Sequence, residues 1–137
     1  MKDLKMYING KFVESRSGKW IDVLNPSTEE VISRQPEGTI DDVDEALDAA
    51  RAAQKPWAAL PAVERAKYLN RLADGIRKRS KEFVDIIMRE QGKTRTWATV
   101  EVGVTADYFD YMATFARHIE GEVIPSEFEL AARFNVS

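Results

Sequence analysis

The apolar pattern of this chain changes its period once, near Thr39, from two residues to about 3.6. Before Thr39, short β-prone runs are separated by turn residues. After it, apolar residues recur three or four positions apart, as they do on one face of a helix. Because strands and helices place side chains at different periods, one element cannot continue across this point. The sequence predicts an α+β arrangement in which two N-terminal β-hairpins are followed by four α-helices.

Two turn signals locate the hairpins. Asn9-Gly10 favours a two-residue turn, because both central residues of that turn have positive φ. Pro26 fixes its own φ and keeps Asn25 out of the helical region, so the chain is expected to turn there as well. The β-prone runs beside these turns are residues 5–8, 11–14, 20–24 and 30–34.

Capping residues and prolines divide the helical section. Thr39 is expected to cap the first helix, and Pro56 is expected to break that helix near its end. Pro61 suits the first turn of a second helix, which the basic residues 77–79 end.

The last two helices are separated by a glycine. Ser80 is expected to cap the third helix, and Gly92 to end it in the left-handed conformation. A fourth helix is then predicted from Thr94 to about His118, before a strand that starts at residues 123–125.

The fourth helix has apolar residues on more than one side, which predicts two packing neighbours. Its aromatic residues could stack on nucleic-acid bases, but at helical spacing they are expected to be core. If one neighbour is missing, an apolar patch is expected to stay exposed. The apolar residues are Trp97, Val100, Val104, Tyr108, Tyr111 and Phe115, with Val102, Phe109 and Met112 as the second set.

Composition excludes several classes of chemistry. The chain has no cysteine, which excludes disulfides, thiol nucleophiles, Fe–S clusters and cysteine-bound zinc. One histidine, His118, cannot form a multi-histidine metal site, and a net charge of −3 argues against nucleic-acid binding. No apolar run approaches the ~18 residues of a membrane span. The N-terminus has no apolar signal core, so a cytoplasmic location is expected.

The candidate chemical groups have simpler structural explanations. The acid-rich residues 41–44 could hold a divalent cation, but the helix dipole favours negative charge in a first turn. Glu101, Asp107 and Asp110 lack the closed site that paired carboxylates need for acid–base catalysis. No glycine-rich phosphate loop is present. The residues by themselves therefore predict no catalytic constellation.

Five segments nevertheless follow one another in a specific order: residues 7–13, 23–32, 39–57, 65–79 and 90–94. The second contains Asn25-Pro26-Ser27-Thr28-Glu29, and the last reads Glu90-Gln91-Gly92-Lys93-Thr94. Together they resemble the N-terminal part of the aldehyde dehydrogenase superfamily. Residues 100–112 look closest to the lactaldehyde and glycolaldehyde dehydrogenase branch, and the similarity covers about residues 6–126.

This resemblance implies a partial aldehyde dehydrogenase fold, an α+β part of a larger α/β fold. The family oxidises aldehydes to acids with NAD(P), using a cysteine thiolate, an asparagine that holds the oxyanion and a glutamate that activates water. In the family these groups lie beyond the region matched here, so no catalytic or cofactor-binding residue is assigned. The resemblance also suggests a monovalent cation between the Leu24 carbonyl and Glu101, although a solvated or salt-bridged side chain is the simpler interpretation of Glu101.

The resemblance divides the chain into three parts. Residues 1–38 form the β-hairpin section, residues 39–121 the helical section of a cofactor-binding domain, and residues 122–137 a strand start and a tail that departs from the family pattern. The expected function is a truncated part of an aldehyde dehydrogenase, inactive and without cofactor alone. Its expected partners are a second copy or an intact family subunit, with no nucleic acid or membrane. The alternative is a stand-alone helical interaction module derived from that family.

Overall fold

The computed structural model describes residues 2–118, 122–124 and 132–134, and within these residues five short strands precede four helices. The predicted order of two hairpins and four helices is confirmed. The first strands are β1 (Lys2–Asp3), β2 (Met6–Ile8), β3 (Lys11–Val13), β4 (Trp20–Leu24) and β5 (Val31–Pro36). The helices are α1 (Ile40–Ala58), α2 (Ala62–Lys78), α3 (Ser80–Gln91) and α4 (Arg95–Thr114), followed by a 3₁₀ turn (Phe115–Arg117), β6 (Glu122–Ile124) and β7 (Ala132–Phe134).

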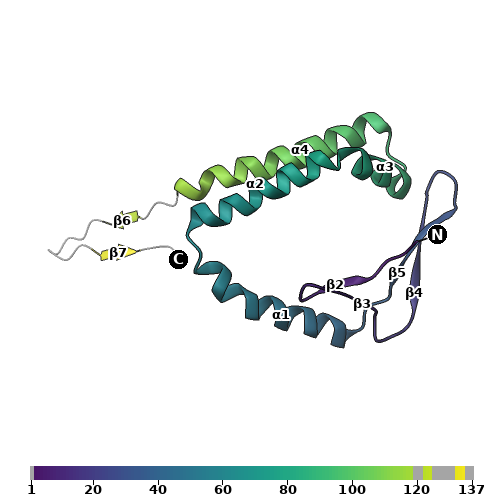
Figure 1. Ribbon diagram of the computed structural model, residues 1–137, viewed down its shortest axis with the longest axis horizontal. Helices are drawn as coiled ribbons and strands as arrows, with labels where there is room; N and C mark the ends of the chain where they lie inside the picture. The colour runs from purple at the N-terminus through teal and green to yellow at the C-terminus, as the bar shows by residue number, and fades with distance from the viewer. Residues whose placement is uncertain (1, 119–121, 125–131, 135–137) are drawn as a thin grey trace.

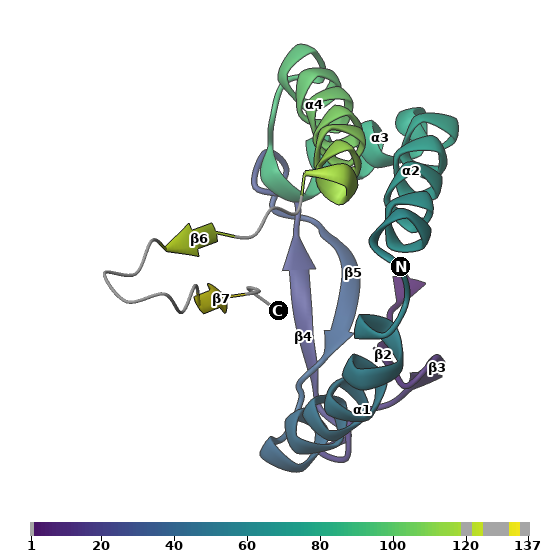
Figure 2. The same cartoon turned by 90° about the vertical axis from the view of Figure 1, so that its left-hand side faces the viewer.

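These elements surround an open centre. Figure 1 shows α2 and α4 side by side along one edge, while α1 leads back to the strands on the other edge. In the turned view of Figure 2, β4 and β5 span the distance between the start of α1 and the turn that joins α3 to α4. The strands therefore lie between the start of α1 and the turn that joins α3 to α4.

The first hairpin forms at the predicted turn. Asn9 and Gly10 have φ values of 49° and 75°, and β2 pairs antiparallel with β3. Tyr7 lies opposite Phe12, and their ring centroids are 5.0 Å apart. The positive φ values explain why Asn-Gly was an informative signal.

The second hairpin joins a three-stranded sheet in the order β1-β5-β4. β4 runs antiparallel to β5, as predicted, and β5 extends to Pro36 at the end of the ladder. The sequence did not indicate β1, which pairs parallel with β5 through only two residues. An ion pair of 2.9 Å between Arg34 and Asp3 accompanies this pairing.

Most helix ends agree with the sequence, and four positions differ in detail. Thr39 caps α1 as predicted, and Gly92 ends α3 at φ 67°. The prediction that Ser80 caps α3 is wrong: Ser80 is the first helical residue, and no side chain caps that end. Pro56 lies inside α1, which continues to Ala58: its missing N–H removes one helical hydrogen bond, and the Ala59 N–H after it still donates to the Lys55 carbonyl.

The other two differences lie at Pro61 and after Thr114. Pro61 occupies the N-cap of α2 rather than its first turn. The fourth helix ends at Thr114, and the 3₁₀ turn continues the chain to the residue before His118. The strand predicted at residues 123–125 is present as β6, although residue 125 lies outside the described residues.

The core lies where α3 and α4 meet. Val84, Ala98 and Val102 are its buried residues. Ala73 of α2 and Ala106 of α4 are also fully buried. Small side chains let helix backbones approach closely, so α4 packs on its neighbours through alanines and a valine. The half-buried residues around this core are Ile76, Phe83, Ile87 and Met88.

The prediction that the aromatic face of α4 belongs to the core is wrong. Trp97 is 65% exposed and Tyr108 is 61% exposed. The buried face instead carries Ala98, Val102 and Ala106, which repeat every four residues on another side of the helix. The prediction that this helix leaves an apolar patch exposed is confirmed.

Candidate functional site

Asp42, which the sequence placed in the acid-rich first turn, is a structural anchor. Its side chain is buried, and its Oδ2 accepts hydrogen bonds from the backbone N–H and hydroxyl of Thr39, both at 2.9 Å. The Ser15 hydroxyl lies 2.9 Å from the same oxygen, and the backbone N–H of Arg16 donates to it at 3.3 Å. These donors, led by the Thr39 N–H, lower the pKa of Asp42 to about 2.

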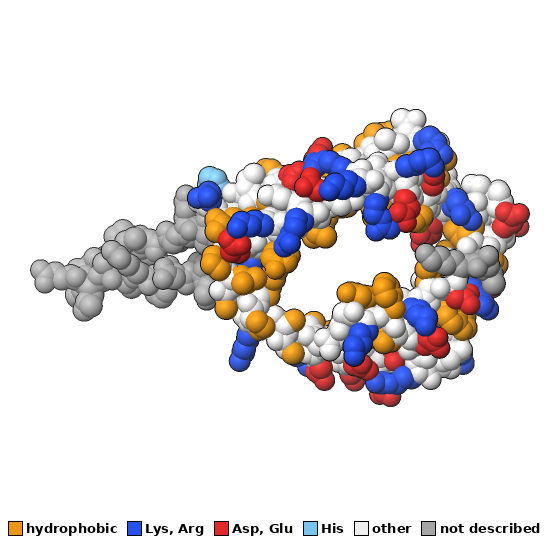
Figure 3. All heavy atoms as spheres, viewed as in Figure 1, with side chains coloured by type: hydrophobic (Ala, Val, Ile, Leu, Met, Phe, Trp, Pro, Cys, Tyr) orange, Lys and Arg blue, Asp and Glu red, His pale blue; other side chains and the backbone are white. Residues whose placement is uncertain are grey.

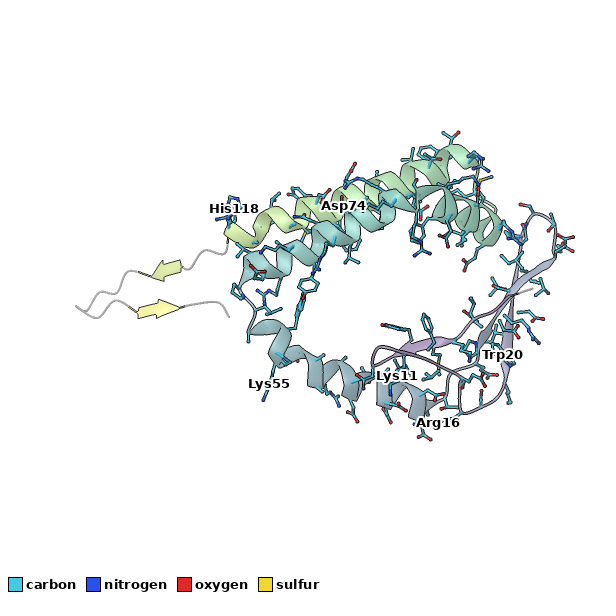
Figure 4. The ribbon with its side chains drawn as sticks, in the orientation of Figure 1. Lys11, Arg16, Trp20, Lys55, Asp74 and His118 are labelled. Atoms are coloured by element: carbon cyan, nitrogen blue, oxygen red, sulfur yellow. The ribbon has the colours of Figure 1, made fainter. Side chains whose placement is uncertain are left out.

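The remaining acidic residues of this turn lie around a shallow, open depression beside Arg16. The Arg16 guanidinium pairs with Glu45 at 2.5 Å and approaches Asp42 at 3.8 Å. Figure 4 shows Arg16 at the start of α1, where the strand section meets the helix. Among the described residues, no three acidic or histidine side chains are grouped as a metal site. The helix-dipole interpretation of residues 41–44 therefore fits the geometry better than a divalent cation.

Glu101, the predicted cation ligand on α4, has a protein partner. Its carboxylate forms an ion pair with the ammonium group of Lys93, which lies in the turn between α3 and α4. Leu24, the other predicted ligand, ends β4, and the loop after it reaches the same turn. A Cβ built on Gly92 would lie 3.0 Å from Pro26 Cγ, so the loop packs directly on this turn. A cation at Glu101 would therefore compete with the Lys93 ammonium.

The other carboxylates of α4 hold helices together. Arg77 of α2 contacts Asp107 at 2.8 Å and Asp110 at 2.7 Å, and these hydrogen bonds raise the pKa of Arg77. Asp85 of α3 pairs with Arg95 at the start of α4, at 3.0 Å. Sequence reasoning missed these pairs because their partners lie 10 to 33 positions apart, beyond the reach of a helical repeat. His118 is exposed at the far end of α4 (Figure 4).

One small apolar cavity lies among α2, α3 and α4. Its volume is about 130 Å³, and its lining includes Phe83, Val102 and Glu101. A pocket for a drug-sized ligand is typically about 300–1,000 Å³. The cavity is therefore too small to hold a dinucleotide.

Exposed apolar side chains gather along α4. Six residues on one side of α4, spaced three or four positions apart, form a continuous line that we call the α4 stripe. Figure 3 shows further hydrophobic side chains along the inner edge of the open centre, over the strands and α1. This surface, rather than any polar cluster, is the candidate functional region. The α4 stripe consists of Trp97, Val100, Val104, Tyr108, Tyr111 and Phe115, all of them exposed.

Comparisons with known proteins agree over nearly the whole chain. A model of the aldehyde dehydrogenase family matches residues 12–136. Lactaldehyde dehydrogenase of Escherichia coli (strain K12) is 53% identical over 122 residues, which are 89% of this chain and 26% of that protein. D-glyceraldehyde dehydrogenase (NADP(+)) of Thermoplasma acidophilum is 43% identical over 122 residues, 89% of this chain and 25% of that protein.

Solved structures show the same arrangement of elements. The crystal structure of lactaldehyde dehydrogenase from Escherichia coli has a TM-score of 0.89 and 51% identity, and the match covers 93% of this chain and 27% of that one. An NAD-dependent benzaldehyde dehydrogenase from Corynebacterium glutamicum has a TM-score of 0.86 and 33% identity, covering 91% and 28%. The chain spans about a quarter of the length of the relatives it matches.

Proposed function

Because the chain belongs to the aldehyde dehydrogenase family, we propose that it forms a structural layer of an aldehyde-oxidising enzyme and performs none of the chemistry itself. The proposal rests on one combined observation: the chain has the fold of the family, and it also has an exposed apolar surface. The elements agree with those of lactaldehyde dehydrogenase at a TM-score of 0.89, yet the α4 stripe is exposed. A layer made to be covered by other parts of an enzyme has this property.

The 137 residues contain no group that could start the family's reaction. Attack on an aldehyde by a covalent mechanism needs an activated nucleophile, and the thiolate used by the resembled family requires a cysteine. This sequence has none. Four described carboxylates, those of Glu45, Asp85, Glu101 and Asp107, form ion pairs with basic side chains.

For the whole enzyme we propose oxidation of a short hydroxyaldehyde with NAD(P). Two of the similar proteins are a lactaldehyde dehydrogenase and a D-glyceraldehyde dehydrogenase (NADP(+)), whose named substrates are both short hydroxyaldehydes. The same proposal includes a cytoplasmic location. It also includes the division of the chain into residues 1–38, 39–121 and 122–137. Among the helices the structure describes, none has the length and apolarity to cross a membrane.

The cation site at Leu24 and Glu101 stays a prediction. The packing of the loop after Leu24 on Gly92, in the turn that leads to the Glu101 helix, supports it, and the Lys93 ion pair opposes it. The stand-alone interaction module is not favoured, because the match to enzymes runs through almost the whole chain.

Binding and activity measurements on the chain alone test the proposal. We expect calorimetric titration with NAD and with NADP to give no saturable heat, and no reduced cofactor to form with lactaldehyde or glyceraldehyde. A full-length relative assayed in parallel is the positive control. Saturable cofactor binding below the millimolar range, or aldehyde-dependent formation of NADH or NADPH, would contradict the proposal.

A further inference from the structure

We propose that Asn9 is a site of spontaneous deamidation, and that its products, aspartate and isoaspartate, weaken the packing of the β2–β3 hairpin on α1. The modification needs water and no enzyme, so it is independent of the proposed function. Asn9 and Gly10 form the exposed turn of this hairpin, with φ values of 49° and 75°. The residue pair that makes the turn therefore also supplies both reacting groups.

The reaction joins the backbone nitrogen of Gly10 to the side-chain carbonyl carbon of Asn9. As this bond forms, the bond between Asn9 Cγ and Nδ2 breaks, and ammonia leaves with the proton of the Gly10 N–H. Water then opens the resulting cyclic imide at either carbonyl, which gives aspartate or isoaspartate. Glycine has no side chain to obstruct the attack. Apart from its chain neighbours, the nearest atom to a Cβ built on Gly10 is the Tyr7 hydroxyl oxygen, at 4.0 Å.

The hairpin leaves these two groups free to approach each other. Its ladder ends at the pair of Ile8 and Lys11, so the Gly10 N–H lies outside the cross-strand pairing. β2 and β3 have three residues each and form a sheet of their own. Because a two-stranded hairpin is only marginally stable, this turn opens more easily than the interior of a helix. Opening lets Asn9 leave its left-handed conformation and bring Cγ to the Gly10 nitrogen.

The two other asparagines that the structure describes lack this combination. Asn25 is followed by Pro26, which has no N–H to lose. Asn70 is exposed like Asn9, but Arg71 follows it inside α2, where backbone N–H groups bond along the helix. Asn70 is therefore an internal comparison, with the same side chain and a protected backbone.

The carboxylate formed at position 9 would face like charges. Asn9 lies beside a depression whose other lining residues include four carboxylates of α1 and one cation, Arg16. Arg16 already pairs with one of these carboxylates, at 2.5 Å. The new charge would thus add repulsion where β2 contacts α1, and isoaspartate would also lengthen the turn and disturb the register. The four carboxylates are those of Asp41, Asp44, Glu45 and Asp48.

Peptide mapping by mass spectrometry tests the reaction. The full chain is incubated in a mildly alkaline buffer, and the mass gain that marks replacement of an amide by a carboxylate is followed at Asn9 and at Asn70. We expect deamidation at Asn9 to be faster by about tenfold or more, because α2 must open before Asn70 can react. Equal rates at the two asparagines would overturn the proposal.

Asn9→Asp reproduces the charge of one product and tests its effect on packing. We expect this variant to melt a few degrees below the unchanged chain at low salt, and the difference to shrink at high salt as the charges are screened. Asn70→Asp is the matched control, because it adds the same charge on α2 between Lys67 and Asp74, which have opposite charges. If the two variants had the same melting temperature at every salt concentration, the proposed effect on the hairpin would be wrong.

Discussion

Asp42 is the residue that joins the strand section to the helical section. Its buried carboxylate accepts hydrogen bonds from Thr39 at the start of α1 and from Ser15 and Arg16 in the loop after β3. The local part of this arrangement, a capping box with Thr39, follows from three-residue spacing. The contact with Ser15 spans 27 positions and depends on the fold.

Ionisation of Asp42 should make stability depend on acid pH. The folded pKa, about 2, lies below the ordinary value of 3.8, so the ionised carboxylate favours the folded state. This contribution should be complete above about pH 4 and should be lost as the pH falls toward 2. We expect Asp42→Asn to lower the melting temperature at pH 7 and to flatten its decline between pH 4 and pH 2.

Asp44→Asn is the control for this prediction, because Asp44 is an exposed acid of the same turn. Thermal melts monitored by circular dichroism across that pH range provide the measurement. If the melting temperatures of Asp42→Asn and of the unchanged chain fell in parallel between pH 4 and pH 2, the hydrogen-bonded carboxylate would contribute nothing to stability.

At the scale of elements, two glycines differ in the space around them: one lies inside a helix and the other ends a helix. Gly75 lies inside α2, and a Cβ there would meet nothing within 4 Å. Gly92 ends α3 at φ 67°, and a Cβ there would lie 3.0 Å from Pro26 Cγ and 3.2 Å from Ser27 Oγ. The first glycine weakens its helix, whereas the second permits both the turn and the packing of the β4–β5 loop.

Alanine substitutions at the two glycines should therefore change stability in opposite directions. Gly75→Ala should stabilise the chain by up to about 1 kcal/mol, because alanine has the higher helix propensity. Gly92→Ala should destabilise it by about 1 kcal/mol or more, from the left-handed backbone and the contact with Pro26. Urea unfolding measures both, and the same sign for the two changes would contradict this account.

At the scale of the whole molecule, the chain buries little for its length. Among the described residues, the buried hydrophobic side chains belong to Ile8, Ala73, Val84, Ala98, Val102 and Ala106. Three of these six are alanines, so the large apolar residues contribute little to the core. The ring-like arrangement in Figure 1 is thus held mainly by strand pairing, helix contacts and surface ion pairs.

The isolated chain should consequently bind dyes that report exposed apolar surface, or associate with itself. Each large side chain left in water forgoes roughly 1.5–3 kcal/mol of burial, against a typical net stability of ~5–15 kcal/mol for a domain. Dye fluorescence and light scattering are the measurements, with a full-length relative as control. A monodisperse monomer with a sharp, cooperative melt and no dye binding would refute this expectation.

The sequence alone determined the features that depend on neighbouring residues. The change of period near Thr39, the turn at Asn9-Gly10, the cap of α1 and the end of α3 at Gly92 are all set by local backbone preferences. The order of motifs also indicated the family, which the comparisons then showed. The cation site at Leu24 and Glu101 was suggested in the same way, but the geometry offers a competing ion pair with Lys93.

Only the tertiary structure decided which apolar face of α4 is buried. Two sets of residues shared the helical period, and hydrophobicity favoured the aromatic set for the core. The small residues Ala98 and Ala106 are buried instead, because they let α4 approach α2 and α3 closely. The tertiary structure alone also shows the pairing of β1 and the ion pairs of Arg77, because their partners lie about 30 positions away in the sequence. A periodic pattern predicts that one face of a helix is apolar, but the positions of the other elements determine which residues cover that face.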